Sequence, residues 1–168
     1  MPVLFDVTAG DFASPALTAH LAPLADRNGA DRIVLRLLLD QPIHSPLRAR
    51  QTVGALRRLG VGLVLADFGS GWSNLAALRH LVPDAVEVRL DTLRRWGDPG
   101  RGLEWICRLV HSVSDGPTIA TEIADQPDAT WALRHGAVLG HGPHWPGHEL
   151  SESGRAAIAD RSRLPLVR

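Results

Sequence analysis

The fold of this 168-residue chain is decided by the stretch Val64-Leu65-Ala66-Asp67-Phe68-Gly69-Ser70-Gly71-Trp72-Ser73-Asn74-Leu75. An apolar strand ends there at an acidic residue, glycines punctuate the loop that follows, and Ser73 is expected to open a helix. A (β/α) barrel presents functional carboxylates in this way, at the carboxyl end of a strand. Asp67 is therefore a candidate site residue.

Five further apolar, β-branched segments flank that strand, and helical patterns separate them. The six predicted strands are Val3–Thr8, Arg32–Leu38, Val61–Asp67, Ala85–Leu90, Thr118–Ile123 and Val138–Gly142. Their near-continuous hydrophobicity is typical of parallel strands that are covered on both faces. The alternation predicts an α/β domain with a parallel sheet, but periodicity alone leaves a doubly wound sheet and a barrel open.

Charge and composition exclude several classes of function. The chain has 18 basic and 18 acidic residues, which argues against nucleic acid or an anionic membrane as a partner. All the basic residues are Arg, so no lysine can act in catalysis. The single Cys107 excludes internal disulfides, and its apolar helical setting predicts a small buried hydrophobe. With no signal-peptide pattern and no apolar run of about 18 residues, we expect a soluble, cytoplasmic protein.

Six segments in order carry recognisable motifs: Phe5–Leu17, Arg32–Leu39, Ala66–Ser73, Leu78–Arg89, Ile119–Asp125 and Gly140–Pro146. Together they resemble the EAL family, the cyclic di-GMP phosphodiesterases. The resemblance implies a TIM-like (β/α) barrel, but the family's name-giving Glu motif and about two strands are expected upstream of the first segment. We therefore expect an incomplete barrel of about six parallel strands in residues 1–150, followed by a helical C-terminal tail in residues 151–168.

The resemblance also implies a site in which carboxylates and one Asn hold two divalent cations, which activate water against a phosphodiester. At the matching positions this chain carries Asp6, Arg36, Ala66, Asp67, Glu87, Arg89, Glu122, Asp125 and His141. Arg36 weighs most, because a guanidinium in place of a metal ligand repels the cation and cannot be deprotonated. The expectation is a chain without catalytic residues, cofactor or metal, with Asp67 and Glu122 as weak candidate ligands.

Two charges are inverted together, because the resemblance implies an acid at Arg36 and a lysine at Glu87. Both side chains are expected in the barrel mouth. We predict that an ion-pair network of Arg36, Glu87, Asp6, Asp67 and Glu122 replaces the metals, with Arg36 bound to at least one of Asp6, Glu87 and Glu122. The alternative is that Asp67 and Glu122 are ordinary polar residues or partners of nearby arginines.

Several histidines and tryptophans have two interpretations each. His141, His144 and His148 could bind a metal through neutral imidazoles, but their spacing fits no established site, which favours loop histidines without metal. Trp72 and Trp145 are interpreted as packing or interface residues in preference to platforms for stacking bases. A third group, the arginines of residues 48–58, is interpreted as a solvated helix surface.

Three functions are weighed. The first is a catalytically inactive EAL-like regulatory domain that acts by protein–protein interaction or dimerisation in cyclic di-GMP signalling. The second is a receptor that binds cyclic di-GMP without cutting it, which the missing phosphate-gripping segment disfavours. The third is a residual phosphodiesterase whose missing segment another chain supplies.

We also expect the chain to form a homodimer and, in addition, to bind an unidentified protein partner. Without closure of the barrel, Val3–Thr8 is an apolar, unpaired edge, and the C-terminal tail or another chain has to cover it. In the EAL family the usual dimer contact is the loop and helix that follow the quoted strand, where Trp72, Leu75 and Arg79 are recognisable. We predict a dimer through that helix or a strand edge, burying at least about 1,200 Å².

Overall fold

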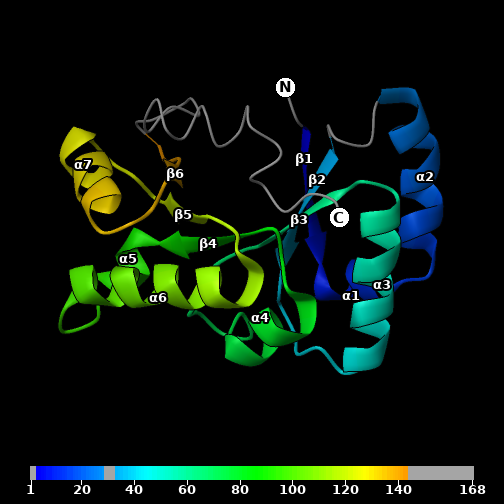
Figure 1. The fold of residues 1–168 in the computed structure, drawn as a ribbon, viewed down its shortest axis with the longest axis horizontal. Coiled ribbons are helices and arrows are strands. Elements are labelled where there is room, and N and C mark those ends of the chain that lie inside the picture. The colour runs from blue at the N-terminus through cyan, green and yellow to red at the C-terminus, as the bar shows by residue number, and fades with distance from the viewer. Residues whose placement is uncertain (1–2, 29–32, 144–168) are drawn as a thin grey trace.

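The computed structural model describes residues 3–28 and 33–143, in which strands alternate with helices (Figure 1). Six strands form one sheet in chain order: β1 (Val3–Thr8), β2 (Ile33–Leu38), β3 (Gly62–Leu65), β4 (Ala85–Arg89), β5 (Thr118–Thr121) and β6 (Leu139–Gly140). Each strand pairs in parallel with the next. The order never reverses, as it would in a doubly wound sheet, so the prediction of an incomplete, barrel-like sheet is confirmed.

The helices follow the strands as the sequence predicts. They are α1 (Ala9–Ala13), α2 (Ala16–Asn28), α3 (Pro46–Arg58), α4 (Leu75–Leu81), α5 (Leu90–Leu93), α6 (Pro99–Ser114) and α7 (Gln126–Arg134). The longer helices lie along the outer side of the curved sheet (Figure 1). No helix in the described ranges is both long and apolar enough to cross a membrane.

The two faces of the sheet differ. The outer face packs against the helices and forms the hydrophobic core, whereas the inner face carries the charged residues. Every second residue of β2, starting with Ile33, is buried, whereas the alternate residues, starting with Val34 and including Arg36, are half-buried. This is the alternation of a strand with one covered face. Helix α3 buries Ala49, Val53 and Leu56 against the outer face. The curved sheet thus presents Arg36 on its inner side.

The helix after the quoted strand begins one residue later than predicted. Asn74, not Ser73, caps α4, and its side-chain oxygen accepts hydrogen bonds from the backbone of Ala76 and Ala77 at 2.9 and 3.3 Å. Ser73 is buried, and its hydroxyl donates to the carbonyl of Ala66 at 2.6 Å. Ser73 therefore closes the loop onto the end of β3, which leaves the capping position to the next residue.

Both edges of the sheet lack a partner strand in the described part of the chain, since β1 pairs only with β2 and β6 only with β5. The exposed fractions of Val3, Leu4 and Phe5 are 51%, 52% and 41%. Side chains of consecutive strand residues point to opposite faces, so this run exposes apolar side chains on both faces of β1, beside its unpaired edge. The predicted C-terminal tail, with His144, Trp145 and His148 before it, lies outside the described residues.

Candidate functional site

A charged cluster forms where the sequence analysis expects the metals of the family. Arg36 lies on β2 in register with Asp6 on β1, and its Nη1 is 3.3 Å from Asp6 Oδ1. Its Nε donates to Glu87 Oε2 on β4 at 2.6 Å. The prediction that Arg36 binds at least one of Asp6, Glu87 and Glu122 is therefore confirmed, with Asp6 and Glu87 as partners.

Glu87 is the buried member of this cluster, with only 2% of its side chain exposed. Arg36 holds one carboxylate oxygen, and Nε2 of His141 lies 3.6 Å from the other. Burial by itself lowers the pKa of Arg36, but attraction to Glu87 and Asp6 outweighs it, so the pKa is raised above its ordinary value. The guanidinium is permanently charged and neutralises a carboxylate that would otherwise be costly to bury.

Ala66 makes this ion pair geometrically simple. Arg36 and Glu87 lie on strands β2 and β4, which are separated by β3. Arg36 is in register with Val64, and continuing the β3–β4 register by one residue places Ala66 beside Glu87. Ala66 is buried, and a methyl side chain leaves room for the guanidinium to reach across the strand. The loss of the acid at Ala66 and the charge inversion at Arg36 and Glu87 are thus parts of one rearrangement.

A second cluster centres on Arg89, which sequence reasoning counted as a lost ligand but did not place in a network. Its Nε and Nη2 donate to the two carboxylate oxygens of Asp91 at 3.0 and 2.8 Å. This hydrogen bonding raises the pKa of Arg89, burial opposes the rise, and attraction to Asp91, Asp67 and Glu122 adds to it. The signal was available in the sequence, because Arg89 and Asp91 are two residues apart at the carboxyl end of a strand.

The predicted single network is therefore wrong in its extent. Asp67 and Glu122 are not bonded to Arg36 in the described structure but lie in the field of Arg89. The alternative interpretation, in which they are partners of a nearby arginine, describes them better. Two guanidiniums, not one, occupy the inner side of the sheet.

The backbone at Asp67 and Glu122 is unusual. Both residues have left-handed dihedrals, with φ of 52° and 61°. This region is uncommon for residues other than glycine and is rare for glutamate. Each residue directly follows β3 or β5 within two positions, so both turns redirect the chain at the carboxyl ends of the strands. The turns of a (β/α) barrel site are present, although the ligand set is not.

Asp125 has a structural role. It is the N-cap of α7, and its Oδ1 accepts a hydrogen bond from the backbone of Asp128 at 2.9 Å. Asp128 accepts from the backbone of Ala124 and pairs with Arg94. Asp125 matches a glutamate of the family's site, but its side chain caps α7 and is not free to bind a ligand.

The remaining residues do not fit the two-cation chemistry that the resemblance implies. In the described ranges no three His, Cys, Asp or Glu side chains are arranged to hold a metal ion. The inward carboxylate of Glu87 is bound by Arg36, and position 66 offers no donor. A dication at this place would have to displace the guanidiniums of Arg36 and Arg89 from the carboxylates with which they are paired. Among the described residues, the side chains at these positions do not form a site for a pair of metals.

The predicted interface residues are available at the surface. Trp72, Leu75 and Arg79 are all exposed.

Cys107 is partly buried, its Sγ lies 3.8 Å from the carbonyl of His135, and burial raises the pKa of its thiol. The thiol is therefore kept protonated and unreactive, in line with the prediction of a packing residue.

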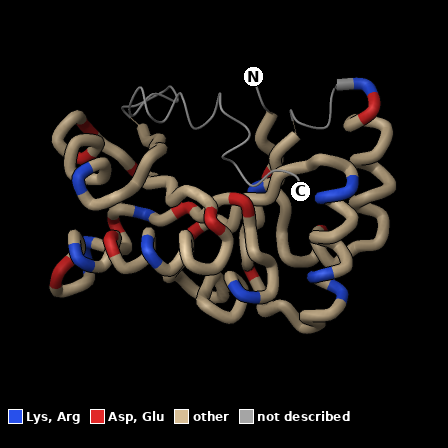
Figure 2. Tube along the Cα trace, in the orientation of Figure 1, with Lys and Arg blue, Asp and Glu red and all other residues tan. Residues whose placement is uncertain are grey.

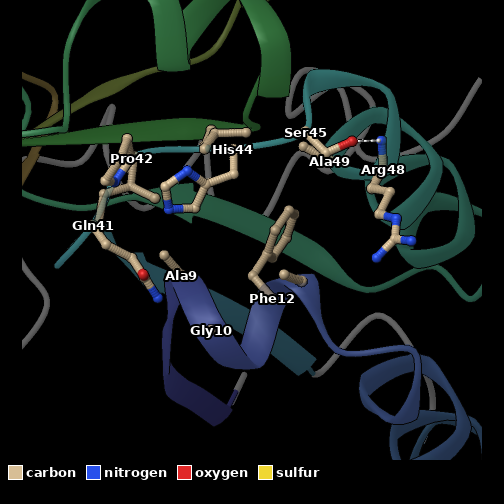
Figure 3. Close-up of a pocket in the computed structure, with 12 residues that line it drawn as sticks. Ala9, Gly10, Phe12, Gln41, Pro42, His44, Ser45, Arg48 and Ala49 are labelled. Carbon is tan, nitrogen blue, oxygen red and sulfur yellow. Dashed lines mark hydrogen bonds between the residues drawn. The ribbon is translucent and has the colours of Figure 1, made fainter.

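A cavity of about 160 Å³ lies between α1 and the start of α3 (Figure 3). Its lining is mainly apolar and includes Phe12, Ile43 and Ala49, with His44 and Arg48 at its margin. No member of the two charged clusters lines it. The cavity is separate from the inner side of the sheet.

Similarity to solved structures agrees with this fold. The EAL domain protein from Listeria monocytogenes EGD-e has a TM-score of 0.76 and 16% identity over 96% of this chain and 65% of its own. Klebsiella pneumoniae BlrP1, solved with calcium and cyclic di-GMP, has a TM-score of 0.73 and 20% identity over 88% of this chain and 39% of its own. Bacillus subtilis YkuI, solved with its substrate cyclic di-GMP and calcium, has a TM-score of 0.74 and 15% identity over 97% of this chain and 45% of its own.

This chain thus spans between 39% and 65% of the length of these three chains. A comparison with curated protein sequences finds no match. The family model described as "EAL domain" matches residues 1–146, which include both charged clusters. The chain belongs to the EAL domain family, whose relatives include cyclic di-GMP phosphodiesterases.

Proposed function

We propose that this chain is a catalytically inactive EAL domain that acts by protein–protein interaction in cyclic di-GMP signalling. The observation that carries the proposal is the Arg36–Glu87 ion pair on the inner side of the sheet, at 2.6 Å. Hydrolysis of a phosphodiester by two metals requires free carboxylates at this place. Here a permanent cation and its buried counterion fill it.

The charge of the inner side also disfavours a nucleotide receptor. Two guanidiniums, of Arg36 and Arg89, are outnumbered by carboxylates, so three negative charges remain. The five carboxylates belong to Asp6, Asp67, Glu87, Asp91 and Glu122. A cyclic dinucleotide carries two phosphates and would be repelled by this field. Its binding would need cations that the side chains do not hold.

The decisive experiment incubates the protein with cyclic di-GMP in the presence of Mg²⁺ or Mn²⁺ and follows the linear dinucleotide by chromatography. An active phosphodiesterase serves as the positive control, and calorimetric titration with and without Mg²⁺ measures binding. We expect neither product nor binding heat. Product above the protein-free blank would overturn the proposal, and binding without product would replace it with the receptor function.

We further propose that the chain forms a homodimer through β1. Support comes from Val3, Leu4 and Phe5, which expose apolar side chains and an unpaired strand edge together. Two copies of β1 paired about a twofold axis would satisfy each other's backbone groups. Helix α4, the other predicted dimer contact, carries the basic residues Arg79 and His80, unlike the apolar run of β1.

A further inference from the structure

We infer that the outer surface shared by α3 and α4 is a docking site for an acidic, amphipathic segment of a partner protein. The α3–α4 surface consists of Arg50, Arg57, Trp72, Leu75, Arg79 and His80. The inference names the partner chemistry that the proposed interaction function leaves open, and so rests on that function.

The first support is the segregation of charge. Helices α3 and α4 carry five arginines and no Asp or Glu, although the whole chain has equal numbers of basic and acidic residues. Figure 2 shows these blue segments on both helices. Elsewhere Arg36, Arg89 and Arg94 are paired with acids, whereas no salt bridge in the described part of the chain involves an arginine of α3 or α4. Arg57 lies in the field of the buried Asp84, and the other arginines of the two helices have no salt-bridge partner among the described residues. The surface therefore carries a net positive charge.

The second support is that the two helices form one continuous surface. Arg50 Nη2 lies 3.4 Å from His80 Nδ1, and Arg57 Nη2 donates to the carbonyl of Val82 at 2.7 Å. These contacts join α3 to the carboxyl end of α4. The α3 arginines are exposed, as predicted for a solvated helix surface, and α4 in addition orients the guanidiniums of Arg50 and Arg57. An oriented guanidinium fork loses less entropy when it binds a carboxylate.

The third support is apolar. Trp72 and Leu75, three residues apart, each expose 49% of their side chains next to the basic residues of α4. Arg79 follows Leu75 by one helical turn, so the two side chains lie on the same face. Leu47 is exposed one turn before Arg50 on α3. The partner therefore has to cover apolar side chains as well as supply negative charge.

Charge complementarity selects the occupant. A second copy of this surface, related by a twofold axis, would place arginines against arginines with no acid on either helix to meet them. A duplex nucleic acid offers phosphates but keeps its base faces stacked in its interior, away from Trp72 and Leu75. A lipid surface demands a wider basic field than a chain of zero net charge provides. A helix with carboxylates on one side and leucines on the other meets both requirements.

The test uses three synthetic peptides of about 18 residues, long enough to form a helix. One is amphipathic and built from Leu, Ala and Glu, the second has Lys in place of Glu, and the third is a scrambled form of the first. Binding is followed by tryptophan fluorescence and calorimetry. We expect the acidic amphipathic peptide to bind at least about tenfold more tightly than either other peptide, and to weaken as salt shortens the screening length.

Matched variants locate the site. Arg50→Glu combined with Arg79→Glu should weaken binding of the acidic peptide at least about tenfold, and Trp72→Ala should have the same effect. The control Arg108→Glu, on the exposed part of α6, should leave this binding unchanged. Circular dichroism checks that each variant is folded. Equal binding of the three peptides, no loss in the double variant, or binding to anionic phospholipid vesicles or duplex DNA instead would overturn the inference. Hydrolysis of cyclic di-GMP would overturn the proposed inactivity without changing these binding results.

Discussion

At the scale of single residues, the Arg36–Glu87 pair explains several differences from the family pattern at once. A buried carboxylate such as Glu87 needs a counterion, and Arg36 supplies it across β3 because Ala66 is small. Without Arg36, the buried Glu87 would lack its main counterion. Their combination is an internal substitute for the charge that metals would bring.

The pair is predicted to behave as a buried ion pair. Arg36→Ala should lower the free energy of unfolding by about 3 kcal/mol, because Glu87 then stays buried without its main counterion. Asp6→Asn should cost less than about 1 kcal/mol, since the Asp6 side chain is 58% exposed. Urea denaturation of each variant provides the measurement.

A double variant provides the control. Arg36→Leu combined with Glu87→Leu removes both charges and keeps side-chain volume, so it should be more stable than Arg36→Ala. If Arg36→Ala proved as mild as Asp6→Asn, the ion pair would not be a stabilising feature of this fold.

At the scale of elements, the junction of β3 and β4 depends on Asp84. Only two residue pairs are in register between these strands, Val64 with Ala85 and Leu65 with Val86. Asp84 extends the junction because its Oδ2 accepts from the backbone of Leu63 and its own backbone donates to the Leu63 carbonyl, both at 2.8 Å. Burial raises the pKa of Asp84, while the bond from Leu63 and the charge of Arg57 oppose the rise.

The raised pKa fixes the sign of a pH effect. Because the native pKa lies above the ordinary 3.8, the native state binds the proton more tightly than the unfolded state. This contribution to stability is complete below 3.8 and is lost as the pH rises through the native pKa. Asp84→Asn cannot ionise, so its stability relative to the wild type should increase over that interval.

Urea denaturation at a series of pH values from below 3.8 to neutrality measures the difference. Asp84→Ala should instead cost about 1–3 kcal/mol, because it leaves the buried Leu63 N–H without an acceptor. A relative stability of Asp84→Asn that falls as the pH rises would contradict the assigned direction.

At the scale of the whole molecule, the open edge of the sheet is the basis of the proposed homodimer. A closed barrel has no free strand edges, whereas β1 has no partner on its outer edge among the described residues and exposes its apolar side chains. The α3–α4 surface is basic and unsuited to self-association. The molecule thus presents two surfaces of different chemistry.

We predict a homodimer that depends on β1. Light scattering at tens of micromolar should give twice the chain mass, and the interface should bury at least about 1,200 Å². Leu4→Lys and Phe5→Lys should shift the protein to monomer, because charges on an edge strand block pairing. Trp105→Gln removes an equally exposed apolar side chain on α6 and should leave the dimer intact. A wild-type mass of one chain would exclude this association.

Much of this protein could be predicted before the tertiary structure. Apolar, β-branched segments located the six strands, and the strand at Val3–Thr8 has the predicted bounds. Local chemistry also accounts for the start of α3, where Ser45 caps a helix that begins with Pro46. The inverted charges at positions 36 and 87 predicted an ion pair between strands that are two apart in the sheet. The strands and the helix start depend on periodicity and local chemistry, which the sequence records directly, whereas the charge inversion was implied by the resemblance to the EAL family.

The tertiary structure alone decided how the remaining charges are divided. Asp67 and Glu122 lie in the field of Arg89, and Asp125 caps a helix instead of facing the site. Equally, only the packing of α3 against α4 brought Arg50 to His80 and made two separate helices one basic surface. The physical reason is that Coulomb energy depends on distance and burial. Those quantities are set by the register and curvature of the sheet, whereas the sequence specifies only which charges are available.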